Sequence, residues 1–182
     1  MTSWRLRSKK LTGTVCPMEP PRVAGTVCPM AVFLIRHAKA GSRSAWTESD
    51  STRPLSTEGE AQARAIADGW SHGAPVAVFS SPRLRCVQTV QPLADRFGLA
   101  VAIEPMVEED TPFEHALRVI EDAADGSVFA SHGDVIPEVV DALIRRGMTI
   151  TGSAGGLRKG AMFVLHREDG RFVRCDYVAP PG

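Results

Sequence analysis

Two histidines in this chain each follow a short apolar run with the pattern of a β-strand. Arg36 and His37 come directly after the apolar residues 31–35, and His132 follows the apolar residues 128–130 by one position. In an open α/β sheet, ligands bind outside the carboxyl ends of the strands, so side chains just past two strand ends can meet in one pocket. We therefore expect His37 and His132 to share a site, and the arginine beside His37 indicates phosphate as its ligand.

Phosphoester hydrolysis without a metal ion requires a nucleophile, cationic donors for the phosphoryl oxygens and an acid for the leaving group. A histidine of ordinary pKa is largely neutral near pH 7, so His37 can attack phosphorus and form a phosphohistidine that water then cleaves. Arg36 and Arg85 are the candidate phosphate-binding residues, because a guanidinium stays charged and matches phosphate oxygens. Arg85 lies in the first turn of an expected helix, whereas Arg83, two positions earlier, is expected to face elsewhere.

Strand-like and helix-like segments alternate from residue 31 onward, which predicts a largely parallel sheet with helices on its faces. Strands are expected over residues 31–35, 76–79, 101–103 and 128–130. A hairpin of residues 162–166 and 172–178 is expected to follow, with its turn at Asp169 and Gly170.

Four helices are expected between these strands from capping residues and apolar spacing. The second helix contains Pro92, where we expect a kink or a break. The third runs to about residue 124, and the fourth has its positive N-terminus beside His132, where an anion is favoured. The expected capping or closing residues are, in chain order, Thr57 and Glu60 with Gly73, then Ser81, then Thr111 with Glu114, and finally Asp134 with Gly147.

The composition is that of a soluble globular protein with one catalytic domain, since 182 residues with 43% hydrophobic and 23% charged side chains suffice for one core. Lys+Arg and Asp+Glu are both 21, so the net charge favours neither nucleic acid nor a membrane as partner. The apolar runs are too short for a membrane span or a secretory signal, so we expect a cytoplasmic protein. Its cysteines lack zinc-type spacing and are expected to be reduced.

Residues 1–29 differ from the rest of the chain and are expected to form a disordered N-terminal leader. They are rich in proline and contain a short repeat, in which residues 13–18 recur as residues 25–30. Met30 stands directly before the first expected strand, so translation starting at Met30 is compatible with the pattern as well as translation starting at Met1.

The motifs at these positions resemble those of the histidine phosphatase superfamily, also called phosphoglycerate-mutase-like. The resemblance rests on an arginine–histidine pair at the end of the first strand, a Ser-Pro-x-x-Arg frame ending at Arg85, and a Ser-His-Gly triplet at residues 131–133. It covers residue 31 to about residue 178 and implies a three-layer α/β/α sandwich, so residues 30–182 are expected to be one histidine phosphatase domain. It also implies that His37 is phosphorylated and that Arg36, Arg85 and His132 bind the phosphoryl group.

Within the superfamily, residues 34–39 together with Asp50, Arg53 and Gly59 are most similar to the small SixA-type phosphohistidine phosphatases. The chain also resembles the phosphatase-like domain fused to some MutT-type Nudix hydrolases, although it contains no Nudix signature. The family's proton donor is a glutamate after the third strand, which implies this role for Glu109, with Glu108 as the alternative. These glutamates belong to a short acidic run that is equally compatible with a solvated surface.

The sequence therefore predicts a metal-independent phosphatase that uses no cofactor and works through phospho-His37 in a shallow, open pocket. The resemblance to SixA implies phosphohistidine on a protein as substrate. An alternative is a phosphatase of small phosphorylated metabolites or nucleotides, and another is an inactive phosphate-binding domain. A metal site is not expected, because arginines adjoin His37 and the histidine and carboxylate spacing differs from that of metal hydrolases.

Overall fold

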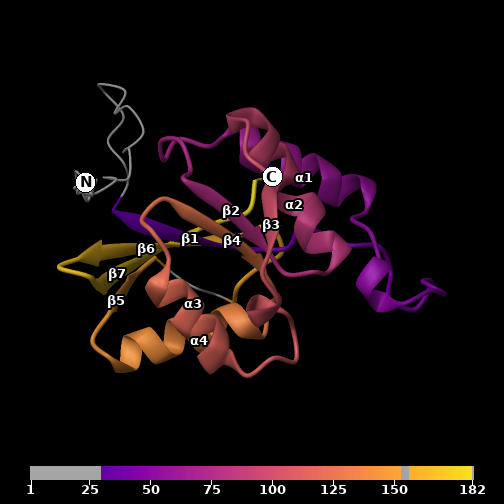
Figure 1. Cartoon of the computed structure of the whole chain (residues 1–182). Coiled ribbons are helices and arrows are strands. Elements are labelled where there is room, and N and C mark those ends of the chain that lie inside the picture. Colours follow the sequence, from indigo (N-terminus) through magenta and orange to yellow (C-terminus); the bar gives the residue numbers. More distant parts are fainter. Residues whose placement is uncertain (1–29, 153–155, 182) are drawn as a thin grey trace, which may run out of the picture.

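The computed structural model describes residues 30–152 and 156–181, which form a sheet with helices on both faces (Figure 1). The sheet has seven strands in the order β3-β2-β4-β1-β6-β7-β5. Strands β3, β2, β4 and β1 are parallel, β6 is antiparallel to β1, β7 is antiparallel to β6, and β5 runs parallel to β7. The strands are β1 (Ala31–Arg36), β2 (Ala77–Ser80), β3 (Val101–Ile103), β4 (Ser127–Ser131), β5 (Thr149–Thr151), β6 (Met162–Glu168) and β7 (Arg171–Val178).

The helices cover the two faces of the sheet in pairs, as the expected three-layer architecture requires. Figure 1 shows α1 and α2 on one face and α3 and α4 on the other. The helices are α1 (Thr57–Asp68), α2 (Leu84–Phe97), α3 (Phe113–Asp122) and α4 (Val135–Arg145), with short 3₁₀ helices η1 (Asp50–Thr52) and η2 (Pro105–Val107). The prediction of a mostly parallel α/β/α sandwich is therefore confirmed.

The central strand β1 is apolar throughout because both of its faces are buried. Val32 and Leu34 belong to the core cluster on the α3 and α4 side, whereas Phe33 and Ile35 belong to the cluster on the α1 and α2 side. Side chains alternate between the faces of a strand, so a continuous apolar run fits a strand covered on both sides. His37 is the first residue after this buried strand.

Several expected helix ends are wrong. The Ser56 side chain, rather than Thr57, caps α1 by accepting a hydrogen bond from the Gly59 N–H at 3.1 Å, and α1 ends at Asp68 instead of reaching Gly73. Helix α2 begins at Leu84 and not next to Ser81, because Arg83 has extended backbone, and the Ser81 hydroxyl contacts His132 instead of capping the helix. Helix α2 also continues through Pro92 without a break.

The predicted hairpin is confirmed as β6 and β7, and its turn residues Asp169 and Gly170 both have positive φ. Two-residue type I′ turns require this conformation at both positions, which explains the Asp-Gly pair. Strand β5 is absent from the sequence prediction, because it is short and exposed and Ile150 is its single apolar residue.

The expected leader, residues 1–29, lies outside the described residues. Cys86 and Cys175, the cysteines within the described part, are buried and unpaired. Among the helices of residues 30–152 and 156–181, none is long and apolar enough to cross a membrane.

Candidate active site

Parallel pairing of β1 with β4 brings His37 and His132 together. Arg36 is in register with Ser131, so the residues that follow them leave the sheet at the same edge. The His37 N–H donates to the Ser131 carbonyl at 3.0 Å. The two imidazole rings lie edge to face with their centroids 5.5 Å apart. The structure thus places both histidines in one site, as their strand-end positions predicted.

The His37 imidazole is held in one tautomer. Its Nδ1 lies 2.8 Å from the Ala38 carbonyl oxygen, which can only accept, so Nδ1 carries the proton and Nε2 keeps its lone pair. The side chain is 7% exposed, and burial, together with the charges of His132, Arg85 and Arg36, lowers its pKa to about 3. His37 is therefore neutral near pH 7, which is the state a nucleophile needs.

His132 is also buried and neutral, and its two ring nitrogens have different surroundings. Nε2 lies 2.8 Å from the Ser81 hydroxyl oxygen and 3.4 Å from the Cys86 sulfur. Nδ1 is buried, has no hydrogen-bond partner among the described residues, and lies 3.4 Å from Glu109 Oε2. Burial lowers the pKa of His132 to about 4, opposed by the Glu109 charge. If Ser81 donates to Nε2, the proton is on Nδ1 and can be given to a phosphoryl oxygen.

Arg85 is the most deeply buried cation of the site, with 1% of its surface exposed. Its Nη1 donates to the backbone carbonyl of Asp50 at 2.9 Å and to the Asp50 carboxylate at 3.0 Å. Hydrogen bonds from Arg43 and Arg53 hold the pKa of Asp50 well below its usual range, so this carboxylate stays ionised. Asp50, the first residue of η1, therefore holds the Arg85 guanidinium in place.

The Arg36 guanidinium packs against Gly133, the residue that follows His132. A Cβ at Gly133 would be 2.5 Å from Arg36 Cζ and 2.7 Å from its Nε, so the glycine of the Ser-His-Gly triplet leaves room for this side chain. Arg36 Nη1 also donates to the Leu157 carbonyl. Its Nε is buried without a partner among the described residues, as is the Nε of Arg85.

Glu109 lies in the site, and Glu108 lies beside it at the rim. Glu109 Oε1 is 2.6 Å from Arg85 Nη2, whereas Glu108 Oε1 is 2.8 Å from Arg83 Nε. Arg83 Nη2 also approaches Glu109 Oε1 at 3.4 Å, so the expectation that Arg83 faces elsewhere is wrong. The reason is that Arg83 precedes α2 in extended backbone, where helical spacing does not set side-chain direction.

Sequence reasoning missed the roles of Ser81, Asp50 and Arg43 around these residues. The local pattern predicts a helix cap for Ser81, and only its position in the Ser-Pro-x-x-Arg frame connects it with the site. Asp50 was part of the SixA-like pattern, but nothing in the sequence showed that it binds Arg85. Cys86, next to Arg85, is a core thiol whose pKa burial raises to about 12.

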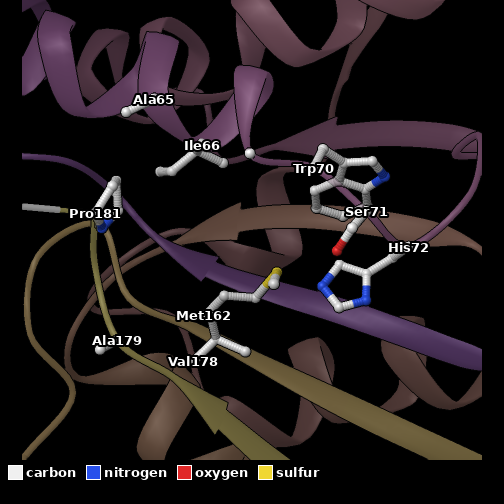
Figure 2. A pocket seen from close by; sticks show the side chains of 11 residues that line it. Ala65, Ile66, Trp70, Ser71, His72, Met162, Val178, Ala179 and Pro181 are labelled. Carbon is white, nitrogen blue, oxygen red and sulfur yellow. The ribbon is translucent and has the colours of Figure 1, made fainter.

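A separate hollow of about 220 Å³ lies between α1 and the end of the chain. Figure 2 shows Trp70 and His72 at one end of it and Ala179 and Pro181 at the other, with Met162 between them. Its lining includes none of the residues expected to bind phosphate. Across residues 30–152 and 156–181, no group of three or more His, Cys, Asp and Glu side chains is placed to hold a metal ion.

Comparison with protein families connects this geometry with known chemistry. A family model described as histidine phosphatase superfamily, branch 1, matches residues 32–111. An 8-oxo-(d)GTP phosphatase of Mycolicibacterium smegmatis is 32% identical over 156 residues, which are 82% of this chain and 48% of that protein. The chain therefore spans about half the length of this curated relative.

Solved structures share the fold. The crystal structure assigned as the phosphohistidine phosphatase SixA of Agrobacterium tumefaciens has a TM-score of 0.64 and 25% identity, covering 84% of this chain and 99% of that one. A mycobacterial glucosyl-3-phosphoglycerate phosphatase has a TM-score of 0.60, and the match covers 81% of this chain and 96% of that chain. At 14% identity, this similarity supports the fold alone.

Proposed function

The chain belongs to the histidine phosphatase superfamily, and we propose that it hydrolyses small phosphorylated metabolites or nucleotides through a phosphohistidine formed on His37. The observation that carries this proposal is the neutral His37 ring, whose Nδ1 donates to Ala38 and whose Nε2 lone pair remains for attack. Arg36 Nε, Arg85 Nε and His132 Nδ1 are buried donors without hydrogen-bond partners among the described residues, and the charges of these three side chains act on His37. Buried polar groups require partners, and phosphoryl oxygens supply acceptors for all of them.

The proposed reaction has two steps. His37 Nε2 attacks phosphorus, the bond from phosphorus to the leaving oxygen breaks, and that oxygen takes a proton from an acid. Water then attacks phospho-His37, releasing inorganic phosphate and the neutral imidazole. Arg36, Arg85 and His132 stabilise the charge that develops on the phosphoryl oxygens, the task a divalent cation has in other phosphatases.

Glu109 favours an ester or anhydride substrate over phosphohistidine. It lies 2.6 Å from Arg85 Nη2 and 3.4 Å from His132 Nδ1, so a carboxyl group adjoins the place where a leaving oxygen would depart. An alkoxide leaves poorly without a proton, whereas the P–N bond of phosphohistidine needs less help from an acid. The similarity to an 8-oxo-(d)GTP phosphatase supports the same substrate class.

The test is a turnover and trapping experiment on the full chain. Nucleotides, sugar phosphates and a phosphohistidine protein are assayed with and without chelator, and the quenched enzyme is analysed for acid-labile phosphate on His37. We expect turnover of the small phosphorylated substrates and no effect of the chelator. The His37→Ala protein is expected to carry no acid-labile phosphate. Wild-type turnover by His37→Ala, or activity that chelation abolishes and one metal restores, would contradict the proposal.

A second candidate is a protein phosphohistidine phosphatase. It is favoured by the similarity to the structure assigned as SixA, 99% of which this chain covers. The same substrate panel separates the two candidates, because this one requires a higher kcat/KM on the phosphohistidine protein than on any small ester.

A further inference from the structure

We propose that Lys159 forms a second anion subsite beside His37, which binds the phosphate next to the one that is hydrolysed. The preferred substrates are then molecules with linked phosphates, such as nucleoside diphosphates and triphosphates. This inference rests on the proposed function, since it assigns the substrate class of the same site.

The backbone around Lys159 is attached to the two residues at the end of β1. The N–H of Gly160 donates to the carbonyls of Arg36 at 3.1 Å and His37 at 3.3 Å, and the Arg36 N–H donates to the Ala161 carbonyl at 3.0 Å. Gly160 has a φ of 77°, a conformation that glycine adopts readily and that turns the chain at this point. The backbone next to Lys159 is therefore held beside the backbone of His37 and Arg36, and the Lys159 side chain is exposed to solvent at this place.

Most cations around the site are already paired with carboxylates. Asp50 pairs with Arg85, Arg43 and Arg53, Glu108 pairs with Arg83, and Glu58 pairs with Lys39.

Lys159 differs from these cations, because no Asp or Glu of the described residues lies within ion-pair distance of it. Burial and the positive charges of Arg36, Arg53, Lys39 and Arg85 lower its pKa. An unpaired ammonium among other cations is unfavourable in the free protein and is stabilised by an anion.

One phosphoryl group does not use all of this positive charge. Arg36 and Arg85 each keep a buried Nε donor without a partner among the described residues, which we assign to oxygens of the reacting phosphoryl group, whereas a lysine acts as a point charge and tolerates a less defined position. A second phosphate linked through a bridging oxygen lies adjacent to the first. Attack by His37 Nε2 on the terminal phosphorus breaks its bond to the bridging oxygen, which leaves with the remaining phosphate, and water then releases inorganic phosphate.

The test compares substrates that differ only in linked phosphates. Hydrolysis of p-nitrophenyl phosphate, GMP, GDP and GTP is measured for the wild type and Lys159→Met, with Arg145→Met as control. Arg145 is an exposed cation at the far end of α4, and its loss is expected to leave every rate unchanged. For Lys159→Met we expect kcat/KM on GDP and GTP to fall about tenfold more than on p-nitrophenyl phosphate, because one charge-assisted contact is lost.

Inhibition by pyrophosphate and orthophosphate gives an independent measurement on p-nitrophenyl phosphate turnover. The inhibition constant of pyrophosphate is expected to rise about tenfold more than that of orthophosphate in Lys159→Met, and Lys159→Arg is expected to restore most of the difference. A sugar bisphosphate with its phosphates far apart is expected to lack this dependence on Lys159. The same dependence there would overturn the assignment to linked phosphates.

The subsite and the proposed function fail in different ways. If Lys159→Met lowers all substrates by one common factor, or none, the subsite is wrong while phosphorylation of His37 stands. If the wild type forms no phospho-His37, the proposed mechanism fails, and calorimetric titration of pyrophosphate into wild type and Lys159→Met still decides the subsite. Equal affinities in that titration would overturn it.

Discussion

Ser81 and Glu109 contact opposite nitrogens of the His132 ring, and each contact has its own chemical consequence. The Ser81 hydroxyl is fully buried and lies 2.8 Å from Nε2, so it sets the orientation of the ring. Glu109 lies on the Nδ1 side, where it also contacts Arg85. The first contact orients a ring that we propose binds phosphate, and the second places a carboxyl group beside His132 and Arg85, where we propose that the leaving group departs.

Ser81→Ala is expected to lower kcat about tenfold, because His132 Nε2 loses its hydroxyl partner and the ring loses its fixed orientation. Steady-state kinetics on p-nitrophenyl phosphate measure the effect. Ser80→Ala is the matched control, since the Ser80 hydroxyl is equally buried but donates to the Ser81 carbonyl at 2.8 Å. Equal losses in both variants would indicate a general packing effect and no positioning role for Ser81.

Glu109→Gln is expected to lower kcat on phosphoesters by about a hundredfold and to have a small effect on phosphohistidine, because only the alkoxide requires a proton from an acid. The measurement is kcat on both substrates for the same preparations. Glu108→Gln is the control, as Glu108 pairs with Arg83 at the rim. If Glu108→Gln gives the selective loss instead, the acid is one residue earlier than we propose.

The proximity of Arg36, His37, Arg85 and His132 could be predicted from the sequence, because strand ends and a first helical turn place side chains predictably. The sequence did not suffice for Arg83. Arg83 lies in extended backbone between β2 and α2. Its contacts with Glu108 and Glu109 depend on the tertiary position of η2. Ion pairs across elements of this kind leave no local pattern in a sequence.

At the level of elements, helix α1 is attached to the backbone just past His37. The Ser56 N–H and hydroxyl both donate to the Lys39 carbonyl, at 2.9 and 3.0 Å. Gly59 packs against the same residue so closely that a Cβ would lie 1.9 Å from the Lys39 carbonyl oxygen. The N-terminus of α1 therefore supports the segment that follows His37, the proposed nucleophile.

Gly59→Ala is expected to destabilise the protein by about 3 kcal/mol or more, because the methyl group meets backbone atoms that cannot rotate away. Thermal unfolding should show this as a decrease of about 2–4 °C in Tm for each kcal/mol. Gly41→Ala is the control, since its Cβ would be 3.8 Å from the Pro54 carbonyl oxygen, an ordinary contact. Equal melting temperatures for Gly59→Ala and the wild type would show that α1 can shift without cost.

The elements that the sequence predicted best are those with both faces buried. Strands β1 and β4 contain continuous apolar runs, residues 31–35 and 128–130, and the Asp-Gly turn between β6 and β7 has a strict conformational requirement. Strand β5 and the position of Ser81 differ from the prediction because each depends on a partner distant in sequence. The partner is β7 for the edge strand β5 and His132 for Ser81, and local propensity does not report such partners. The cap of α1 is a local contact between Ser56 and Gly59, one residue before the cap that the sequence predicts.

At the level of the whole molecule, the sheet divides the apolar core into two main clusters, and the polar site lies at its edge between them. His37 and His132 are both buried there in the neutral state. Folding therefore removes two imidazoles from water and prevents them from accepting protons that the unfolded chain would accept. The stability of the domain is coupled to pH through the same side chains that are proposed to do the chemistry.

The free energy of unfolding is expected to fall as the pH is lowered from about 6.5 to 5. The folded pKa values, about 3 for His37 and about 4 for His132, lie below the ordinary value of 6.5, so in this window the unfolded chain binds more protons. The stabilisation is complete above pH 6.5 and decreases by up to about 1.4 kcal/mol per pH unit for each histidine. Denaturant unfolding of the wild type, His37→Gln and His132→Gln at several pH values measures the slopes. In each variant, the slope of the free energy of unfolding against pH should be smaller by about the contribution of one histidine. Slopes equal to that of the wild type would show that these rings bind protons in the folded state as readily as in the unfolded chain.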